Sequence, residues 1–242
     1  RNEVGLGADN WLGGIITRTD GRAEPQKATL AIARAAEKLG ATIITGCSVR
    51  GLETSGGNVS KVITEKGTIN TSTVLCAAGA WSSFFCRSLG IKVPQLKVKG
   101  TVARTNSIET KIKGNIFDKK VSIRKRLDGG YTIAHGAILD HPITPSTLYF
   151  APKYIQALVK EFNVLKISIG KEFIEELTAP KTWDLDKVSP FERNRVLNPK
   201  PNKNIISKIT NQVGKVYPEL KGAKIIETWA GMVETTPDVV PV

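Results

Sequence analysis

The stretch from Thr71 to Ser83 constrains the fold more than any other part of this chain. A short apolar run, Val74 to Cys76, leads into Ala-Ala-Gly-Ala at residues 77–80 and then into Trp-Ser-Ser, which can open a helix. This order predicts a buried strand that ends in a turn where only small side chains leave room. Such a turn lets a ligand approach the backbone closely, and free N–H groups at a helix start attract anions. A plain strand-to-helix turn has the same pattern, so the neighbouring segments are needed to choose between a ligand-binding turn and a purely structural one.

The residues before this stretch predict the rest of a compact α/β unit. Residues 26–39 place their apolar side chains on one helical face. Residues 41–45 predict a strand that continues through Val49, and residues 58–64 and 67–70 predict a hairpin. Helix, strand, hairpin, buried strand and glycine turn therefore follow one another in that order.

Beyond residue 90 the sequence predicts a mostly β region with helices. The clearest hairpin joins residues 121–126 to residues 131–134, because Asp-Gly-Gly between them supplies the turn. Further strands are predicted at residues 11–17, 95–104, 111–117 and 224–232, and helices at residues 82–89, 152–165, 170–178 and 202–217. Residues 180–201 predict a long loop, and the chain is expected to stop within a β-hairpin.

This order of elements resembles the second half of the flavin-binding domain in the D-amino-acid oxidase family, which includes glycine oxidase, sarcosine oxidase and D-amino-acid dehydrogenase. Three further segments are similar to that family's motifs: Gly13-Gly14-Ile15-Ile16 with Asp20-Gly21 and Glu24-Pro25, Ser189-Pro190-Phe191-Glu192-Arg193 with Arg195-Val196-Leu197-Asn198-Pro199, and Trp229-Ala230-Gly231-Met232 with Thr236-Pro237-Asp238. The resemblance implies an α/β (α+β) fold. Residues 1–90 would form part of an FAD-binding domain, and residues 91–242 a truncated substrate-binding domain with a mixed, largely antiparallel sheet and flanking helices.

The resemblance also assigns cofactor-binding roles. Val49 would lend backbone groups to the adenine edge of FAD, and Ala77, Ala78, Gly79 and Trp81 would line the adenosine–pyrophosphate path. For Val49 a plain strand residue is an equal alternative, whereas a side chain at position 79 would fill the ligand's space. The family's Gly-x-Gly-x-x-Gly element is not found in this sequence. The chain is therefore expected to be an internal fragment that is inactive by itself.

By the same resemblance, the parent protein would oxidise the C–N bond of a D-amino acid or secondary amine to an imine, with hydride transfer to the flavin. A substrate carboxylate needs a cation, and Arg124 is the candidate, with Tyr131 across the hairpin and His135 just beyond it. A solvated arginine and a structural histidine are the alternatives. No catalytic base is predicted. Several family members carry arginine after Trp-Ala-Gly-Leu, whereas Val233 stands there in this chain, which leaves the substrate open.

The net charge of +13 raises nucleic-acid binding as an alternative function. The lysines are scattered and lack interleaved aromatic residues, since the chain holds only four tryptophans, four tyrosines and seven phenylalanines. A solvated lysine surface explains the charge better. A binding module without cofactor is the other alternative, and a small-molecule amine or amino acid is the expected partner.

Localisation and assembly rest on weaker signals. The sequence contains no run of 18 apolar residues that would predict a transmembrane span, and no signal peptide is visible in it. Cys47, Cys76 and Cys86 have neither metal-site nor disulfide spacing, which favours small core residues in a reducing compartment, the cytoplasm. No metal site is predicted. Self-association is expected, because the flavin-domain half would expose the apolar face that a missing strand covers.

Overall fold

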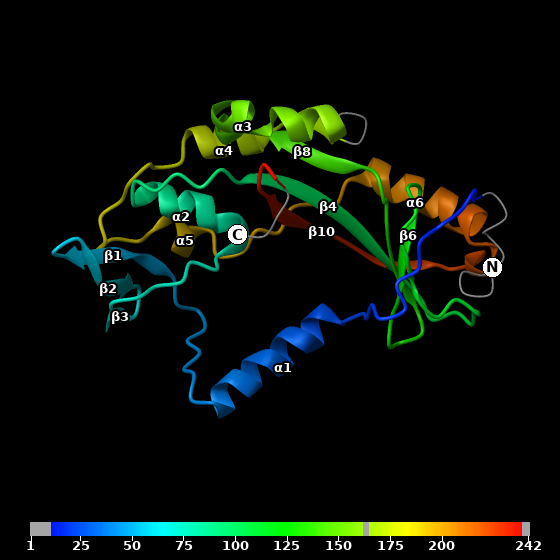
Figure 1. Cartoon of the computed structure of the whole chain (residues 1–242), viewed down its shortest axis with the longest axis horizontal. Coiled ribbons are helices and arrows are strands. Elements are labelled where there is room, and N and C mark those ends of the chain that lie inside the picture. The colour runs from blue at the N-terminus through cyan, green and yellow to red at the C-terminus, as the bar shows by residue number, and fades with distance from the viewer. Residues whose placement is uncertain (1–10, 162–164, 239–242) are drawn as a thin grey trace. The chain divides into compact units, whose positions relative to one another are not determined.

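The computed structural model describes residues 11–161 and 165–238 (Figure 1). The chain divides into two compact units, each assembled from stretches that are separated in sequence. Unit 1 comprises Arg1–Ile43, Thr101–Ile138 and Lys200–Ala230, and unit 2 comprises Ile44–Gly100, Leu139–Pro199 and Gly231–Val242. Two long paired strands, β4 (Leu96–Thr105) and β10 (Ile225–Thr235), contribute residues to both units.

In unit 1, an antiparallel sheet is built on the predicted hairpin. Strands β5 (Asn115–Ile116), β6 (Ser122–Lys125) and β7 (Tyr131–Ala134) pair in that order, and β7 continues onto the end of β4. The prediction of a hairpin around Asp-Gly-Gly is confirmed, because Gly129 takes the left-handed conformation (φ 84°) that the turn requires. The strand predicted at residues 111–117 is reduced to the two residues of β5.

The core of unit 1 lies between this sheet and helix α6 (Lys203–Val216). The helix is the one predicted at residues 202–217, and Asn202 caps it by accepting hydrogen bonds from the N–H groups of Asn204 and Ile205. The short 3₁₀ helix η3 (Pro218–Leu220) follows it. The buried cluster contains Ala103, Ile112, Ile116, Val121, Ile123, Tyr131, Ile133, Ile205, Ile209, Val213, Tyr217 and Leu220.

Helix α1 (Pro25–Lys38) also belongs to unit 1 and confirms the predicted helix at residues 26–39. None of its residues is buried, and Ile32 on its apolar side is 70% exposed. The sequence pattern therefore found the helix, but its apolar face is exposed rather than packed.

In unit 2, strands β1 (Val49–Ser55), β2 (Asn58–Thr64) and β3 (Gly67–Asn70) form an antiparallel meander. This confirms the predicted strand at Val49 and the hairpin after it. The 3₁₀ helix η2 (Gly79–Trp81) and helix α2 (Ser82–Ser88) follow.

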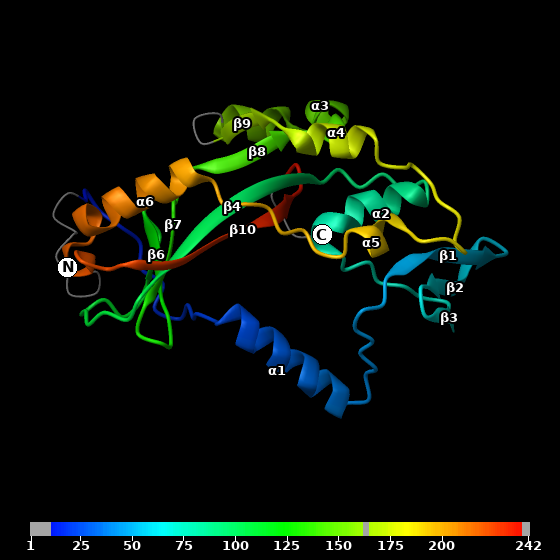
Figure 2. The same ribbon diagram turned by 180° about the vertical axis from the view of Figure 1, so that it is seen from behind.

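The other part of unit 2 contains a parallel strand pair, β8 (Leu139–Ile143) and β9 (Leu165–Ile169), with β8 also antiparallel to β4 at Lys99. Helix α3 (Pro145–Glu161) connects the two strands, and α4 (Lys171–Leu177) and α5 (Pro190–Arg193) follow. Figures 1 and 2 both show α3 and α4 beside β8. The mixed, largely antiparallel sheet with flanking helices is thus confirmed, although β8 and β9 were not predicted.

Several predictions of local structure are wrong, including the end of the helix predicted at residues 152–165, because Leu165 begins β9, and the unbroken loop predicted at residues 180–201, because α5 lies within it. Residues 71–78 form no strand, because no strand in the described part of the chain pairs with them, and Leu75 is 89% exposed instead of buried. Residues 11–17 and 41–45 are also irregular. Cys76 is exposed, whereas Cys86 is buried as expected. The expected hairpin end at residues 239–242 lies outside the described residues.

Among the helices of the described residues, none has the length and apolar character needed to cross a membrane. The same residues contain no group of His, Cys, Asp and Glu side chains placed to hold a metal ion.

Candidate functional site

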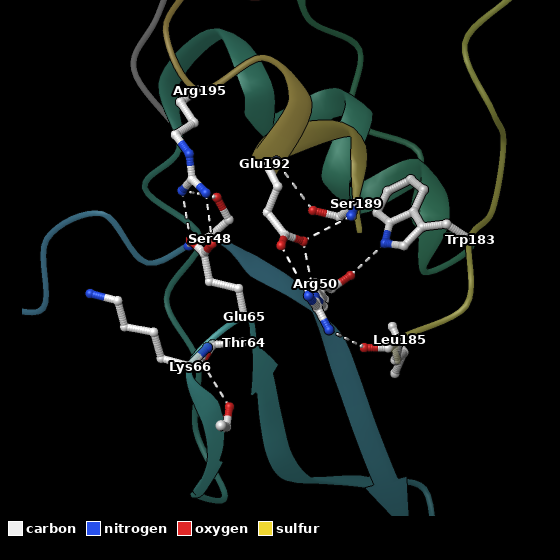
Figure 3. Close-up of polar contacts among 11 residues, drawn as sticks. Ser48, Arg50, Thr64, Glu65, Lys66, Trp183, Leu185, Ser189, Glu192 and Arg195 are labelled. Atoms are coloured by element: carbon white, nitrogen blue, oxygen red, sulfur yellow. Dashed lines mark hydrogen bonds and ion pairs between the residues drawn. The ribbon is translucent and has the colours of Figure 1, made fainter. Parts of the chain in front are cut away.

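Val49, the residue expected at the adenine edge, begins β1, and the residues on both sides of it are tied to distant segments of unit 2 (Figure 3). On one side, the Ser48 N–H donates to Glu65 Oε1 at 2.6 Å. Arg195 donates to both oxygens of the same carboxylate, each at 2.6 Å, and to the Ser48 hydroxyl at 3.2 Å. Glu65 therefore fixes the backbone just before Val49.

On the other side, Arg50 forms a two-pronged ion pair with Glu192, with Nε–Oε1 and Nη2–Oε2 distances of 2.9 and 3.0 Å. The backbone carbonyl of Arg50 accepts a hydrogen bond from Trp183 Nε1 at 2.7 Å. Glu192 also completes a capping box at the start of α5 with Ser189. We call the contacts of Ser48 and Arg50 with Glu65, Trp183, Glu192 and Arg195 the β1 clamp.

The charges of the β1 clamp are strongly stabilised. Hydrogen bonding from Arg195, followed by that from the Ser48 N–H, lowers the pKa of Glu65 to about 2. Arg50 first and the Ser189 N–H second lower the pKa of Glu192 to about 2. Both carboxylates are therefore ionised at neutral pH, and the pKa values of both arginines are raised by the same hydrogen bonds.

The small-residue turn lies in the same unit. Ala77 and Ala78 are exposed, and Gly79 begins η2 with φ 53°, a left-handed conformation that favours glycine. Trp81 packs edge-on against Phe191 of α5, with ring centroids 5.6 Å apart. The turn thus presents small side chains and an accessible backbone, as a bound dinucleotide requires.

The chemistry next to Gly79 indicates which part of FAD would fit. A Cβ at position 79 would lie 3.7 Å from Glu234 Oε1, so a carboxylate borders the turn. A carboxylate suits ribose hydroxyls and repels phosphate. The described residues therefore fit the adenosine end of FAD, and the glycine motif that cradles the pyrophosphate is not in this sequence.

Of the three residues expected to contact substrate, Arg124 already has hydrogen-bond and ion-pair partners within unit 1. Its guanidinium donates to the Ala23 carbonyl and to Thr132 Oγ1, and it lies 3.8 Å from Glu24 Oε2. Tyr131 is fully buried, and its hydroxyl donates to the Ile112 carbonyl at 2.9 Å. Because Arg124 pairs with Thr132 across the hairpin, Tyr131 faces the opposite side of the sheet. The structure does not bring these two side chains together.

His135 is half-buried at the end of β7. Its Nδ1 accepts hydrogen bonds from the N–H groups of Ala137 and Ile138, both at 3.2 Å. Burial lowers the pKa of His135, followed by the charge of Lys208. A neutral histidine that shapes its own loop fits these contacts.

Sequence reasoning missed the β1 clamp. Glu192 and Arg195 lie in the segment that resembles the family, and Ser189 with Glu192 three residues later is a readable capping box. The ion-pair partners of both residues are 130 or more positions away in the sequence, so no local pattern could show them.

Comparisons with known proteins agree with this fold. A family model described as DAO, FAD dependent oxidoreductase, matches residues 2–242. The chain is 38% identical over 102 residues to the D-amino acid dehydrogenase of Sinorhizobium medicae (strain WSM419), which covers 41% of this chain and 24% of that protein. It is 31% identical over 130 residues to the mitochondrial sarcosine dehydrogenase of Mus musculus, covering 51% of this chain and 14% of that protein.

Among solved structures, the L-amino acid deaminase from Proteus myxofaciens in complex with anthranilate matches with a TM-score of 0.85 and 32% identity, over 91% of this chain and 49% of that chain. The L-proline dehydrogenase from P. horikoshii matches with a TM-score of 0.64 over 92% of this chain and 47% of that one, at 23% identity, which shows a shared fold. The matched parts span about half the length of these solved structures and a quarter or less of the curated relatives.

The mixed sheet, the small-residue turn and these matches define the class as flavin-dependent oxidoreductases. Within that class, the chain belongs to the DAO family of FAD-dependent oxidoreductases, because the family model matches nearly all of its length. FAD is the cofactor that this family uses.

Proposed function

We propose that the protein oxidises the C–N bond of an amino acid or secondary amine to an imine. The observation that carries this proposal is the match of the family model over residues 2–242. The sequence motifs favour a D-amino acid or a secondary amine. Because the structural relatives include L-amino acid deaminases, L-amino acids belong in the same screen. When bound, FAD supplies the hydride acceptor.

Within this proposal, residues 1–90 contribute to the FAD-binding domain and residues 91–242 to substrate binding. The backbone at Val49 contacts the adenine edge, held in place by the β1 clamp, and Ala77, Ala78, Gly79 and Trp81 line the adenosine side. Support comes from the exposure of residues 77–78 and from the clamp contacts on both sides of Val49.

The substrate-side residues carry less support. Arg124 and His135 stay candidates for substrate contact, although each already has hydrogen-bond partners in unit 1. The buried hydroxyl of Tyr131 favours a structural role. A cytoplasmic location stays a prediction that rests on cysteine usage.

The proposal also includes self-association of the chain. Val74 and Leu75 are 37% and 89% exposed, and an apolar surface of this kind favours association. Light scattering should therefore report a mass above 26.2 kDa. A strictly monomeric mass across a tenfold range of concentration would contradict this part.

The test of the main proposal is an absorbance spectrum of the protein after incubation with FAD and gel filtration, followed by anaerobic addition of candidate substrates. Because the chain alone is expected to be inactive, the turnover test uses the protein with the family's Gly-x-Gly-x-x-Gly segment restored. There we expect retained flavin absorbance, and bleaching of the flavin by D-amino acids, L-amino acids or N-methyl amines. A protein that retains no flavin would contradict the cofactor site, and a bound flavin that none of these compounds bleaches would contradict the proposed activity.

A further inference from the structure

The two arginines of the predicted hairpin are paired with carboxylates. Arg124 lies beside Glu24, and Arg126 donates to Asp128 at 3.0 Å. An arginine that already has a carboxylate partner gains little from a second one. A cation for a substrate carboxylate is therefore better sought elsewhere.

Unit 2 contains a pocket of about 260 Å³ where two cations lie without a carboxylate partner. Lys97 and Arg87 both line it, and neither forms an ion pair among the residues that the structure describes. The wall also includes the apolar side chains of Trp81, Phe84, Leu96, Pro142, Leu197 and Met232.

Lys97 is held by an aromatic ring instead of an acid. Its Nζ lies 5.5 Å from the ring centroid of Trp81. Burial is the main cause that lowers the pKa of Lys97, and the charge of Glu176 opposes this effect. A half-buried ammonium whose neighbour is an aromatic ring gains from an anionic ligand.

Arg87 shows the same lack of a partner. Its guanidinium lies 5.2 Å from the centroid of the Phe84 ring. Its Nε is buried, and no hydrogen-bond partner for it exists among the described residues. A buried donor without a partner costs free energy, which a bound carboxylate would recover.

Three glutamates of α4 also reach the pocket. Glu175 pairs with Lys171, and Glu176 accepts a hydrogen bond from the Ser146 N–H at 2.8 Å. Glu172 is the third, and its charge suits an ammonium group. The pocket therefore combines two cations, the three carboxylates of α4 and an apolar wall.

We propose that this pocket binds an amino acid with an apolar side chain, and that Lys97 and Arg87 hold its carboxylate. This inference rests on the proposed function, since it names the substrate class of the same enzyme. Trp81 belongs both to the pocket wall and to the residues proposed to line the adenosine side of FAD, and all of these lie within unit 2.

The test uses benzoate, an apolar body with a carboxylate, and benzylammonium, the same ring with a cation. Calorimetric titration at pH 7 needs no flavin and no turnover. We expect saturable benzoate binding and weaker binding of benzylammonium. The Lys97→Gln and Arg87→Gln variants should each bind benzoate at least tenfold more weakly, because each loses one charge-assisted hydrogen bond.

Lys153→Gln, which removes an exposed lysine of α3 outside the pocket, is the matched control and should bind as the unchanged protein does. Equal benzoate affinity in Lys97→Gln and Lys153→Gln would overturn the proposal. So would a preference of the unchanged protein for benzylammonium, a result that does not depend on any variant folding. Failure of amino acids to bleach the flavin would instead count against the proposed function and leave the titration result as it stands.

Discussion

Replacing Tyr131 by phenylalanine separates a structural role of this residue from a substrate-binding one. The substitution removes only the hydroxyl, which is fully buried, donates to the Ile112 carbonyl at 2.9 Å and also contacts Thr110 Oγ1. Ile112 is itself 1% exposed, so its carbonyl has no access to water in place of the lost donor.

The expected cost follows from these contacts. A lost hydrogen bond by itself lowers the free energy of unfolding by about 1 kcal/mol. The buried Ile112 carbonyl would keep only a long hydrogen bond from Thr110 Oγ1, at 3.5 Å, which raises the cost to between about 1 and 3 kcal/mol. The matched control is Tyr149→Phe, because Tyr149 is 59% exposed and water replaces its contacts. We expect that variant to stay within about 0.5 kcal/mol of the unchanged protein.

Urea denaturation followed by far-UV circular dichroism measures both variants. The midpoint of the transition that reports unit 1 should fall for Tyr131→Phe with an unchanged slope. Ligand binding in the same variant should stay as it is. Equal stability of the two variants, or a loss of ligand affinity without a loss of stability, would refute the structural role and restore Tyr131 as a substrate contact.

Three further perturbations have defined outcomes. The pKa values of Glu65 and Glu192 are lowered from 4.5 to about 2 in the folded state. The stabilisation that these two carboxylates provide is therefore present above pH 4.5 and is lost as the pH falls toward 2. Glu192→Gln should flatten this part of a profile of unfolding free energy against pH. Gly136→Ala should lower the thermal midpoint strongly, since a Cβ there would overlap the Asp118 carbonyl oxygen, and an unchanged midpoint would contradict the backbone placement. Gly79→Ala meets only ordinary contacts, so the left-handed backbone alone should cost about 1 kcal/mol in urea denaturation, and flavin retention should fall as well.

Predictions from the sequence succeeded where the determinants are local. The hairpin at residues 121–134 was predictable because its turn residues lie between its strands, and α6 because its buried positions recur every turn. The buried strand expected at the apolar run Val74 to Cys76 depends on a neighbouring strand, and no local pattern says whether one is present. The parallel pair β8–β9 was missed for the same reason: its register is set across the intervening helix α3.

In the candidate site, too, local features were predictable from the sequence and contacts between distant residues were not. The glycine turn at Gly79 was predictable from its run of small residues, and its positive φ confirms the turn, whereas its role in cofactor binding stays a prediction. Arg124 was predicted as a substrate contact from its residue type. Only the structure shows that its guanidinium already contacts Glu24, Thr132 and the Ala23 carbonyl. Residue type selects candidates, but the availability of a charge depends on partners that come from distant parts of the chain.

The β1 clamp and the pocket share one segment of unit 2, which gives them a common physical basis. Trp183 and Glu192 hold the backbone and side chain of Arg50, next to Val49. Phe191 directly precedes Glu192 in the chain, and its ring centroid lies 5.5 Å from that of Phe84, which lines the pocket. Leu197, in the same segment, forms part of the pocket wall. Loosening the clamp would therefore shift the pocket wall as well. An adenine contact and a carboxylate contact positioned by the same segment would respond together, so a single substitution at Glu192 should weaken both FAD and benzoate binding, whereas Lys97→Gln should weaken only the latter.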